Sequence, residues 1–174
     1  MDRRRMLHAF KTAREVGNYE DAAVLPENVD PQIHLSTNTL AQPFYLVCEK
    51  DTVLGQLSGA ALVRLRASTA NRFDLEPGDM LYVPAGTPHR IEPQSASVQI
   101  RYKVRDSERE GAVWSCPACD EQVARLDWRL TDPPSASYVA ACEWFNERVA
   151  GSGCPSCGEV VPSVATEILA GSPA

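Results

Sequence analysis

The sequence predicts a mainly β protein, a barrel or sandwich of short strands followed by a small metal-binding extension. Two observations lead to this class. Short apolar runs recur at nearly regular intervals between residues 33 and 104, with turn residues between them. Four of the six cysteines form two close pairs after residue 115. The 174 residues are enough for one globular domain with a buried core.

Four runs have the composition of strands, at residues 44–48, 61–65, 80–83 and 98–104. In the last run Arg101 and Lys103 alternate with apolar neighbours, which predicts that the strand has one wet face carrying these cations and one dry face. We therefore assign residues 33–105 to a β-barrel.

The segments on either side of the barrel differ in character. Residues 3–16 place Met6, Phe10 and Ala13 at helical spacing, which predicts a surface helix, and an extended lead-in follows to residue 32. A charged stretch at residues 106–110 is expected to be a linker. The chain then divides into a lead-in at 1–32, the barrel at 33–105 and a C-terminal extension at 106–174.

The C-terminal extension is predicted to contain one helix, at residues 135–149. Tyr138, Ala141, Cys142 and Phe145 share one face of this helix. Pro133 and Pro134 before the helix and Gly151 after it mark its ends. We expect the shared face to be buried against the rest of the protein.

The paired cysteines have the spacing of a four-cysteine metal site, Cys116-Pro-Ala-Cys119 and Cys154-Pro-Ser-Cys157. In such a knuckle two thiolates point at one ion and backbone amides point at the sulfurs. Four thiolates suit one Zn²⁺ or one iron ion, and they leave no open position for a substrate. The site is therefore predicted to be structural, and the isolated Cys48 and Cys142 are predicted to be small buried residues.

A second motif lies in the barrel, where Gly78 is followed after five residues by Pro84-Ala-Gly86 and then, two residues later, by His89. The glycines permit the turns that bracket a short strand, and Pro84 stiffens the approach to His89. This pattern matches the second motif of the cupins, which are jelly-roll barrels, also described as double-stranded β-helices. It predicts that His89 points into the barrel.

Together these features resemble the bacterial 3-hydroxyanthranilate 3,4-dioxygenases, over about residues 30–162 and best at Phe44-Tyr45, at 75–89 and at both knuckles. That family opens an aromatic ring with O₂. It uses Fe²⁺ held by two histidines and one glutamate, and it carries a rubredoxin-like metal site. The resemblance implies that His89 and the four knuckle cysteines keep their family roles.

The rest of the family's iron site is changed in this chain. Where the family has its first histidine and its glutamate, this sequence has Ser36 and Gln42, and neither is a usual Fe²⁺ ligand. A register shift of two residues would bring His34 to the same interior face, since a shift of two preserves the side of a strand. His34, His89 and Gln42 would then form an unusual ligand set.

Three functions remain open from the sequence. The first is a diverged cupin enzyme that acts on a small aromatic or amino-acid-derived acid by acid–base chemistry, as a decarboxylase, isomerase or lyase. The second is a metal-dependent ring-cleaving dioxygenase with His34 and His89 as ligands. The third is a non-catalytic small-molecule-binding cupin. For the first, the expected catalytic residues are His89, Arg101, Gln42 and Tyr102, and the expected substrate-binding residues are Ser36, His34, Tyr45 and Arg101.

Composition and charge limit the partners. The formal net charge of −6 argues against a nucleic-acid surface, which needs clustered positive charge. No run of about 20 apolar residues predicts a membrane span, and the first residues lack the apolar run of a secretion signal. We expect a cytoplasmic homodimer, the pairing by analogy with other cupins, that binds one small-molecule substrate.

Overall fold

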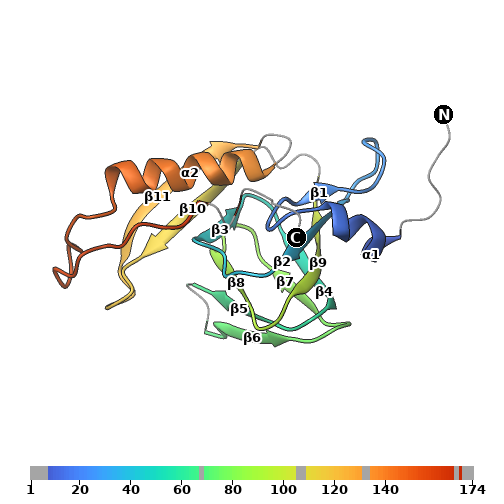
Figure 1. The fold of residues 1–174 in the computed structure, drawn as a ribbon, viewed down its shortest axis with the longest axis horizontal. Coiled ribbons are helices and arrows are strands. Elements are labelled where there is room, and N and C mark those ends of the chain that lie inside the picture. The colour runs from blue at the N-terminus through green and yellow to red at the C-terminus, as the bar shows by residue number, and fades with distance from the viewer. Residues whose placement is uncertain (1–7, 67–68, 105–108, 131–133, 167–168, 170–174) are drawn as a thin grey trace.

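The computed structural model describes residues 8–66, 69–104, 109–130, 134–166 and 169. Within these residues, eleven strands form two antiparallel sheets that face each other and enclose the barrel interior, as Figure 1 shows. The predicted class is confirmed: the chain is a mainly β cupin barrel with a cysteine cluster near its C-terminus.

The first sheet has five strands in the order β1-β2-β9-β4-β7. Their bounds are β1 Ala22–Ala23, β2 Gln32–Asn38, β9 Ser97–Lys103, β4 Thr52–Ser58 and β7 Met80–Val83. The second sheet has six strands in the order β11-β10-β3-β8-β5-β6. Their bounds are β11 Gln122–Arg129, β10 Arg109–Ser115, β3 Tyr45–Cys48, β8 His89–Pro93, β5 Ala61–Leu65 and β6 Arg72–Leu75.

The helices lie outside the barrel. Of the helix predicted at 3–16, residues 1–7 lie outside the described part, and the remainder forms a single α-helical turn, α1 (Ala9–Thr12), followed by a 3₁₀ turn at Ala13–Glu15. The second helix, α2 (Pro134–Arg148), agrees closely with its prediction and begins on a proline, whose missing N–H is not needed there. Pro133 lies outside the described residues.

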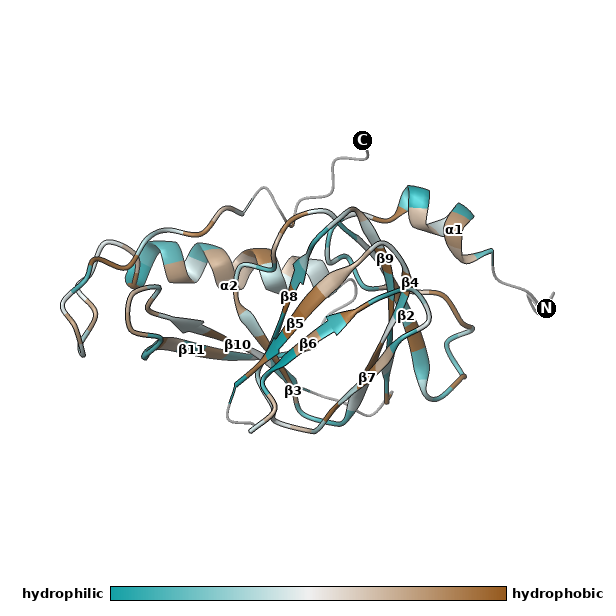
Figure 2. Cartoon of the chain, turned by 90° about the horizontal axis from the view of Figure 1, so that it is seen from below, coloured by the Kyte–Doolittle hydropathy of each residue, from teal (hydrophilic) through white to brown (hydrophobic). Residues whose placement is uncertain are grey.

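The apolar core lies between the sheets and continues under α2. Leu46, Leu54 and Val63 belong to it, and so does the whole predicted face of α2, Tyr138, Ala141, Cys142 and Phe145. Figure 2 shows an apolar stretch along β5 in the barrel wall. Cys48 and Cys142 are buried, as predicted. Among the described helices, none is both long and apolar enough to cross a membrane.

One prediction about β9 is wrong. Arg101 and Lys103 do not face water: they are 3% and 5% exposed and point into the barrel. The other face of the strand carries Ile100 and Tyr102, which pack with Leu35 and the α1 region outside the barrel. Polar and apolar residues do alternate along β9, as predicted. The face that carries the cations is the interior one, because buried carboxylates lie there and pair with them.

The extension is joined to the barrel by strand pairing and by aromatic packing. β10 pairs with β3, with Ala112 opposite Leu46, and β10 also pairs with β11. Trp114 of β10 stacks on Phe145 of α2 with ring centroids 4.7 Å apart. The predicted linker is corrected in its described part, because Arg109 and Glu110 begin β10, whereas residues 106–108 lie outside the described part. The division at residues 32 and 105 stays a prediction.

Candidate functional site

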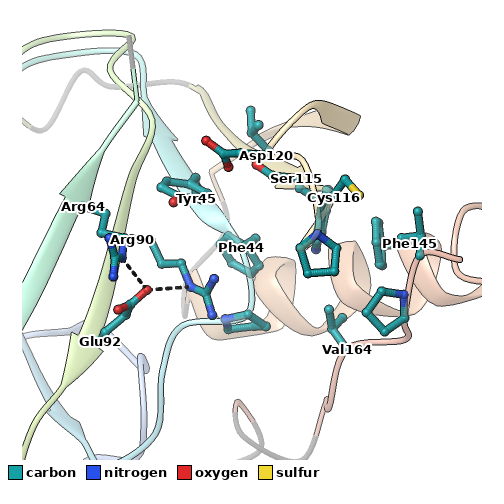
Figure 3. Close-up of a pocket in the computed structure, with 16 residues that line it drawn as sticks. Phe44, Tyr45, Arg64, Arg90, Glu92, Ser115, Cys116, Asp120, Phe145 and Val164 are labelled. Atoms are coloured by element: carbon teal, nitrogen blue, oxygen red, sulfur yellow. Dashed lines mark hydrogen bonds and ion pairs between the residues drawn. The ribbon is translucent and has the colours of Figure 1, made fainter. Parts of the chain in front are cut away.

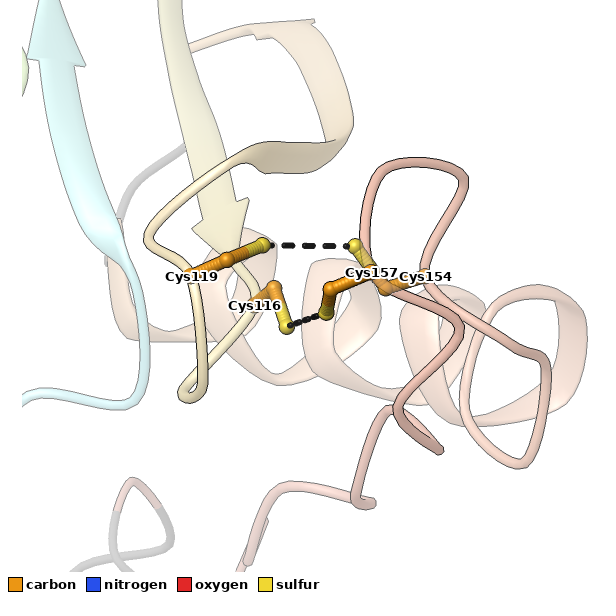
Figure 4. A group of neighbouring side chains, drawn as sticks. All are labelled: Cys116, Cys119, Cys154 and Cys157. Carbon is orange, nitrogen blue, oxygen red and sulfur yellow. Dashed lines mark hydrogen bonds between the residues drawn. The ribbon is translucent and has the colours of Figure 1, made fainter.

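The four paired cysteines converge at the end of the extension (Figure 4). Their sulfur atoms all lie within 4.8 Å of one another. Across the two knuckles, Cys116 Sγ is 3.6 Å from Cys157 Sγ, and Cys119 Sγ is 3.7 Å from Cys154 Sγ. The structure therefore brings together four residues that are separated by up to 41 positions in the chain.

The two knuckles repeat the same backbone geometry. Asp120 N–H donates to the carbonyl of Cys116 at 2.9 Å, and Gly158 N–H donates to that of Cys154 at 2.9 Å. Asp120 and Gly158 both adopt the left-handed conformation, with φ of 60° and 78°, which glycine adopts freely and aspartate tolerates better than most residues. Backbone N–H groups, first that of Cys157, lower the pKa of Cys154 to about 7.

This geometry fits a tetrahedral metal ion. Metal–sulfur bonds of about 2.3 Å in a tetrahedron place the sulfurs about 3.8 Å apart, close to the two distances across the knuckles. Cys116, Cys119, Cys154 and Cys157 would hold the ion, which would neutralise their charge and fasten the two loops together. All four positions would be protein ligands, so the site would be structural. The geometry suits zinc and iron equally.

A second polar cluster, which we call the barrel network, lies inside the barrel around His89. His89 is fully buried, and its Nε2 lies 2.6 Å from Nη1 of Arg101. A guanidinium only donates, so Nε2 must accept. The ring proton is therefore on Nδ1, where the Thr87 carbonyl oxygen lies 3.2 Å away. His89 thus acts as a neutral acceptor held by a cation.

The barrel network continues through two carboxylates and a second cation. Asp21 Oδ2 lies 3.6 Å from Nε of Arg101 and 3.5 Å from Nζ of Lys103. Glu110 Oε1 is 2.5 Å from the same Nζ. The Tyr138 hydroxyl donates to Asp21 at 3.1 Å or to Glu110 at 3.2 Å. Two cations therefore face two carboxylates, and the buried charge is balanced, as buried charges require.

The electrostatics follow from burial and from these pairs. Burial, and then the charge of Arg101, lowers the pKa of His89 to about 3, so the imidazole is neutral at pH 7. Burial raises the pKa of the Cys48 thiol to about 11, so it is no thiolate nucleophile at neutral pH. Burial opposes the charged form of Asp21, but Lys103 and Arg101 outweigh it and lower the carboxyl pKa.

Two polar atoms in the barrel lack a hydrogen-bond partner among the described residues. They are Nε of Arg101 and Nδ1 of His34. His34 and Arg101 are direct cross-strand partners on β2 and β9, so their side chains lie on one face within reach of a common small group. Buried polar atoms are nearly always hydrogen-bonded to protein, water or ligand. These two atoms therefore mark a place for a polar ligand or a water molecule.

The other predicted site residues lie apart from this place. Tyr102 lies on the opposite face of β9, with the α1 region, so its assignment to the same site is wrong. Tyr45, expected to bind substrate, lines a cavity outside the barrel, beside Arg66, and its role in binding stays a prediction. Gln42 is buried, but its Oε1 accepts from the Ile91 backbone N–H at 3.3 Å. Ser36 is buried on the interior face of β2.

The barrel interior does not fit the iron site that the resemblance implies. The family's ligand positions carry Ser36 and Gln42, and Gln42 is engaged with the backbone of β8. The remaining nitrogen of His89 faces the guanidinium of Arg101, so a divalent cation at Nε2 would meet a positive charge. Among the described residues, the four cysteines are the one group of three or more histidine, cysteine or carboxylate ligands whose atoms lie this close together.

Comparison with known proteins finds similarity over part of the chain. A family model described as a JmjC domain matches residues 49–110. The 3-hydroxyanthranilate 3,4-dioxygenase of Cupriavidus pinatubonensis is 32% identical over 99 residues, which are 52% of this chain and 50% of that protein. The enzyme of the same name from Burkholderia cenocepacia is 30% identical over 111 residues, 62% of each chain. These partial, low-identity matches support a distant, diverged relationship to that group of cupin enzymes.

The matched segments span 50% and 62% of these two relatives' length. A solved hydroquinone 1,2-dioxygenase, PnpCD, in complex with Cd²⁺ and 4-hydroxybenzonitrile, superposes with a TM-score of 0.50 at 17% identity, over 56% of this chain and 71% of that chain. That likeness shows the cupin fold alone.

Four members of the barrel network were not predicted from the sequence as site residues. They are Asp21, Lys103, Glu110 and Tyr138. Asp21 was read as part of a lead-in, Glu110 as a linker residue and Tyr138 as core packing. One signal was available in the sequence: Lys103 lies two positions after Arg101, which places both side chains on one face of β9.

Proposed function

We propose that this chain is a metal-independent cupin enzyme that acts on a small aromatic or amino-acid-derived acid by acid–base chemistry. The observation that carries the proposal is a pair of buried atoms that lack a hydrogen-bond partner among the described residues, beside the neutral imidazole of His89. They are Nδ1 of His34 and Nε of Arg101, and the latter has only the ion-pair contact with Asp21 at 3.6 Å. A carboxylate or developing oxyanion would accept hydrogen bonds from both atoms, with His34 in its Nδ1–H tautomer.

His89 would be the proton acceptor and donor. In the free protein Arg101 lowers the pKa of His89, after burial itself. An anionic substrate next to the guanidinium would offset that charge and raise the pKa towards neutrality, where an acid–base catalyst is most effective. With the guanidinium of Arg101 drawn from Nε2 onto the substrate anion, Nε2 would be free to take a proton from one carbon and return it at another, as in an isomerisation. In a decarboxylation, a protonated His89 would instead deliver a solvent-derived proton to the carbon that loses CO₂. Neither step needs a redox cofactor.

A cavity at the rim of the barrel offers a route to this place. It has a volume of about 370 Å³ and lies beside β3 and β10. Its lining includes Glu110 of the barrel network and Cys48, whose Sγ lies 3.8 Å from Glu110 Oε1. A substrate entering there would meet the edge of the network first, and Arg101 Nη1 lies 3.9 Å from the Cys48 sulfur. Entry therefore involves a rearrangement of the Lys103–Glu110 pair.

The test is proton exchange in D₂O. A panel of small aromatic and amino-acid-derived acids is incubated with the protein without O₂, and deuterium incorporation is followed by proton NMR. Exchange or turnover should appear for at least one acid and fall by about 10²-fold or more in His89→Gln, the usual worth of a general acid–base catalyst. His8→Gln, at an exposed position, is the matched control. Undiminished exchange in His89→Gln refutes the proposal.

A non-catalytic binding cupin is the second candidate, and the balanced barrel network favours it, since every charge there already has a partner. Binding of an acid without exchange or turnover would support this candidate. Turnover that requires both O₂ and added Fe²⁺ would instead support the dioxygenase alternative with His34 and His89. The homodimer, the cytoplasmic location and the absence of a nucleic-acid partner stay predictions.

A further inference from the structure

A cavity with charged walls lies outside the barrel, between the second sheet and the cysteine extension (Figure 3). Its volume is about 520 Å³, within the range of about 300–1,000 Å³ that is typical of small-molecule sites. We call it the joint cavity. One wall belongs to β3, β5 and β8, and the opposite wall to the first knuckle, α2 and the segment after the second knuckle.

The barrel wall of the joint cavity carries two guanidinium groups over one carboxylate. Arg64 Nε lies 3.0 Å from Glu92 Oε1, and Arg90 Nε lies 3.9 Å from the same oxygen. Figure 3 shows both arginines converging on Glu92. The trio has an excess of one positive charge. Arg64 remains 41% exposed, so its free N–H groups can bind a further anion.

Most of the remaining lining suits an apolar body, and the carboxylate of Asp120, which also belongs to the lining, is paired with Arg66 at 2.9 Å. The ring of Tyr45 lies between the arginines and the knuckle, with the Arg66 guanidinium 5.4 Å from its centroid. Aromatic, proline and valine side chains continue the surface, namely Phe44, Pro117, Phe145, Pro162 and Val164. A flat apolar group would pack there while its charged end reaches the arginines.

We propose that the joint cavity binds a small carboxylic acid with an aromatic body, with the carboxylate at Arg64 and Arg90 and the ring against Tyr45. This site is separate from the barrel network, because no residue of that network belongs to its lining. A guanidinium binds a carboxylate through two parallel hydrogen bonds, which gives the orientation. Glu92 competes for the same guanidinium groups and weakens the binding.

The experiment measures benzoate binding to the full chain by isothermal titration calorimetry and by saturation-transfer NMR. Arg64→Gln should weaken binding at least about fivefold, and Glu92→Gln should strengthen it by a similar factor, since one charge-assisted hydrogen bond is worth about that much. Arg72→Gln removes the same charge from an exposed residue of β6 outside the cavity and should leave binding unchanged. Benzamide, which has no charge, should bind at least about tenfold more weakly.

Several outcomes would overturn the proposal. The first is that the wild type does not bind benzoate up to about 10 mM, which is well above a millimolar dissociation constant. The second is that Arg64→Gln and Arg72→Gln lose benzoate affinity equally. The third is that His89→Gln loses benzoate binding, which would place benzoate in the barrel. Thermal unfolding checks the fold of each variant, above all at Glu92, which is 22% exposed, and at His89, which is buried. The opposite effects of Arg64→Gln and Glu92→Gln could not arise from misfolding, which would weaken both.

Discussion

Acidification should destabilise the wild type through His89, and replacing His89 with glutamine should remove that effect. In the unfolded chain the imidazole has its ordinary pKa of 6.5, and in the barrel burial and Arg101 lower it to about 3. The unfolded protein therefore binds the proton first as pH falls. The stability from a neutral His89 is fully present above pH 6.5 and is lost progressively as pH falls towards 3.

The size of the effect follows from the two pKa values. Between pH 7 and pH 4.5 the proton-linkage relation gives a loss of about 2.5 kcal/mol in the free energy of unfolding for this one group. The pKa of His34 is also lowered and destabilises the protein in the same direction as pH falls. This effect is present in both the wild type and His89→Gln, so it cancels in the difference between their free energies of unfolding. The pKa of Asp21 is lowered from 3.8, so its contribution is lost below this window.

The assay is urea unfolding of the wild type and His89→Gln at several pH values from 7 to 4.5, with His8→Gln as control. The stability difference between wild type and His89→Gln should narrow by about 2.5 kcal/mol across this range. The wild-type imidazole resonances of His89 should also remain those of a neutral ring at pH 4.5. A difference independent of pH, or a His89 ring that titrates near pH 6.5, refutes the buried arrangement with Arg101.

Three further predictions concern stability, each measured by urea unfolding. Lys103→Met should cost about 3–5 kcal/mol, because it leaves Asp21 and Glu110 buried with one cation fewer; a cost below 1 kcal/mol would contradict the network. Tyr138→Phe removes the hydroxyl that these carboxylates share and should cost about 1–3 kcal/mol, whereas no loss would mean that water replaces it. Gly59→Ala should cost more than about 1 kcal/mol, because φ is 67° and the added methyl group would press on a backbone carbonyl; an unchanged midpoint would contradict that strain.

Much of the fold and the metal centre could be predicted because their information is local. The spacing of Cys116 and Cys119 fixes a knuckle within four residues, and the glycine and proline positions before His89 fix its approach to the barrel. The boundaries of β5, β7 and α2 agree with apolar runs for the same reason. Strands such as β2 and β4 were missed because the polar residues of one face interrupt their apolar runs.

The barrel network could not be predicted because its members come from distant parts of the chain. Asp21 precedes Lys103 by 82 residues and Tyr138 by 117. Each is ordinary by itself: an acidic lead-in residue, a lysine in an alternating strand and a tyrosine on a helix face. Their common role appears when the strand order places β9 next to β2 and β10 next to β3. The misplaced Tyr102 shows the complementary error, since neighbours on a strand point to opposite sides.

The central claim is that Arg101, rather than a metal ion, occupies the free nitrogen of His89. Metal content per chain, determined by elemental analysis of the purified wild type and of Cys154→Ser and His89→Ala, tests it most directly. About one equivalent is expected in the wild type and in His89→Ala, and near zero in Cys154→Ser, as for a single four-thiolate site. A second equivalent that survives Cys154→Ser and disappears in His89→Ala would contradict it.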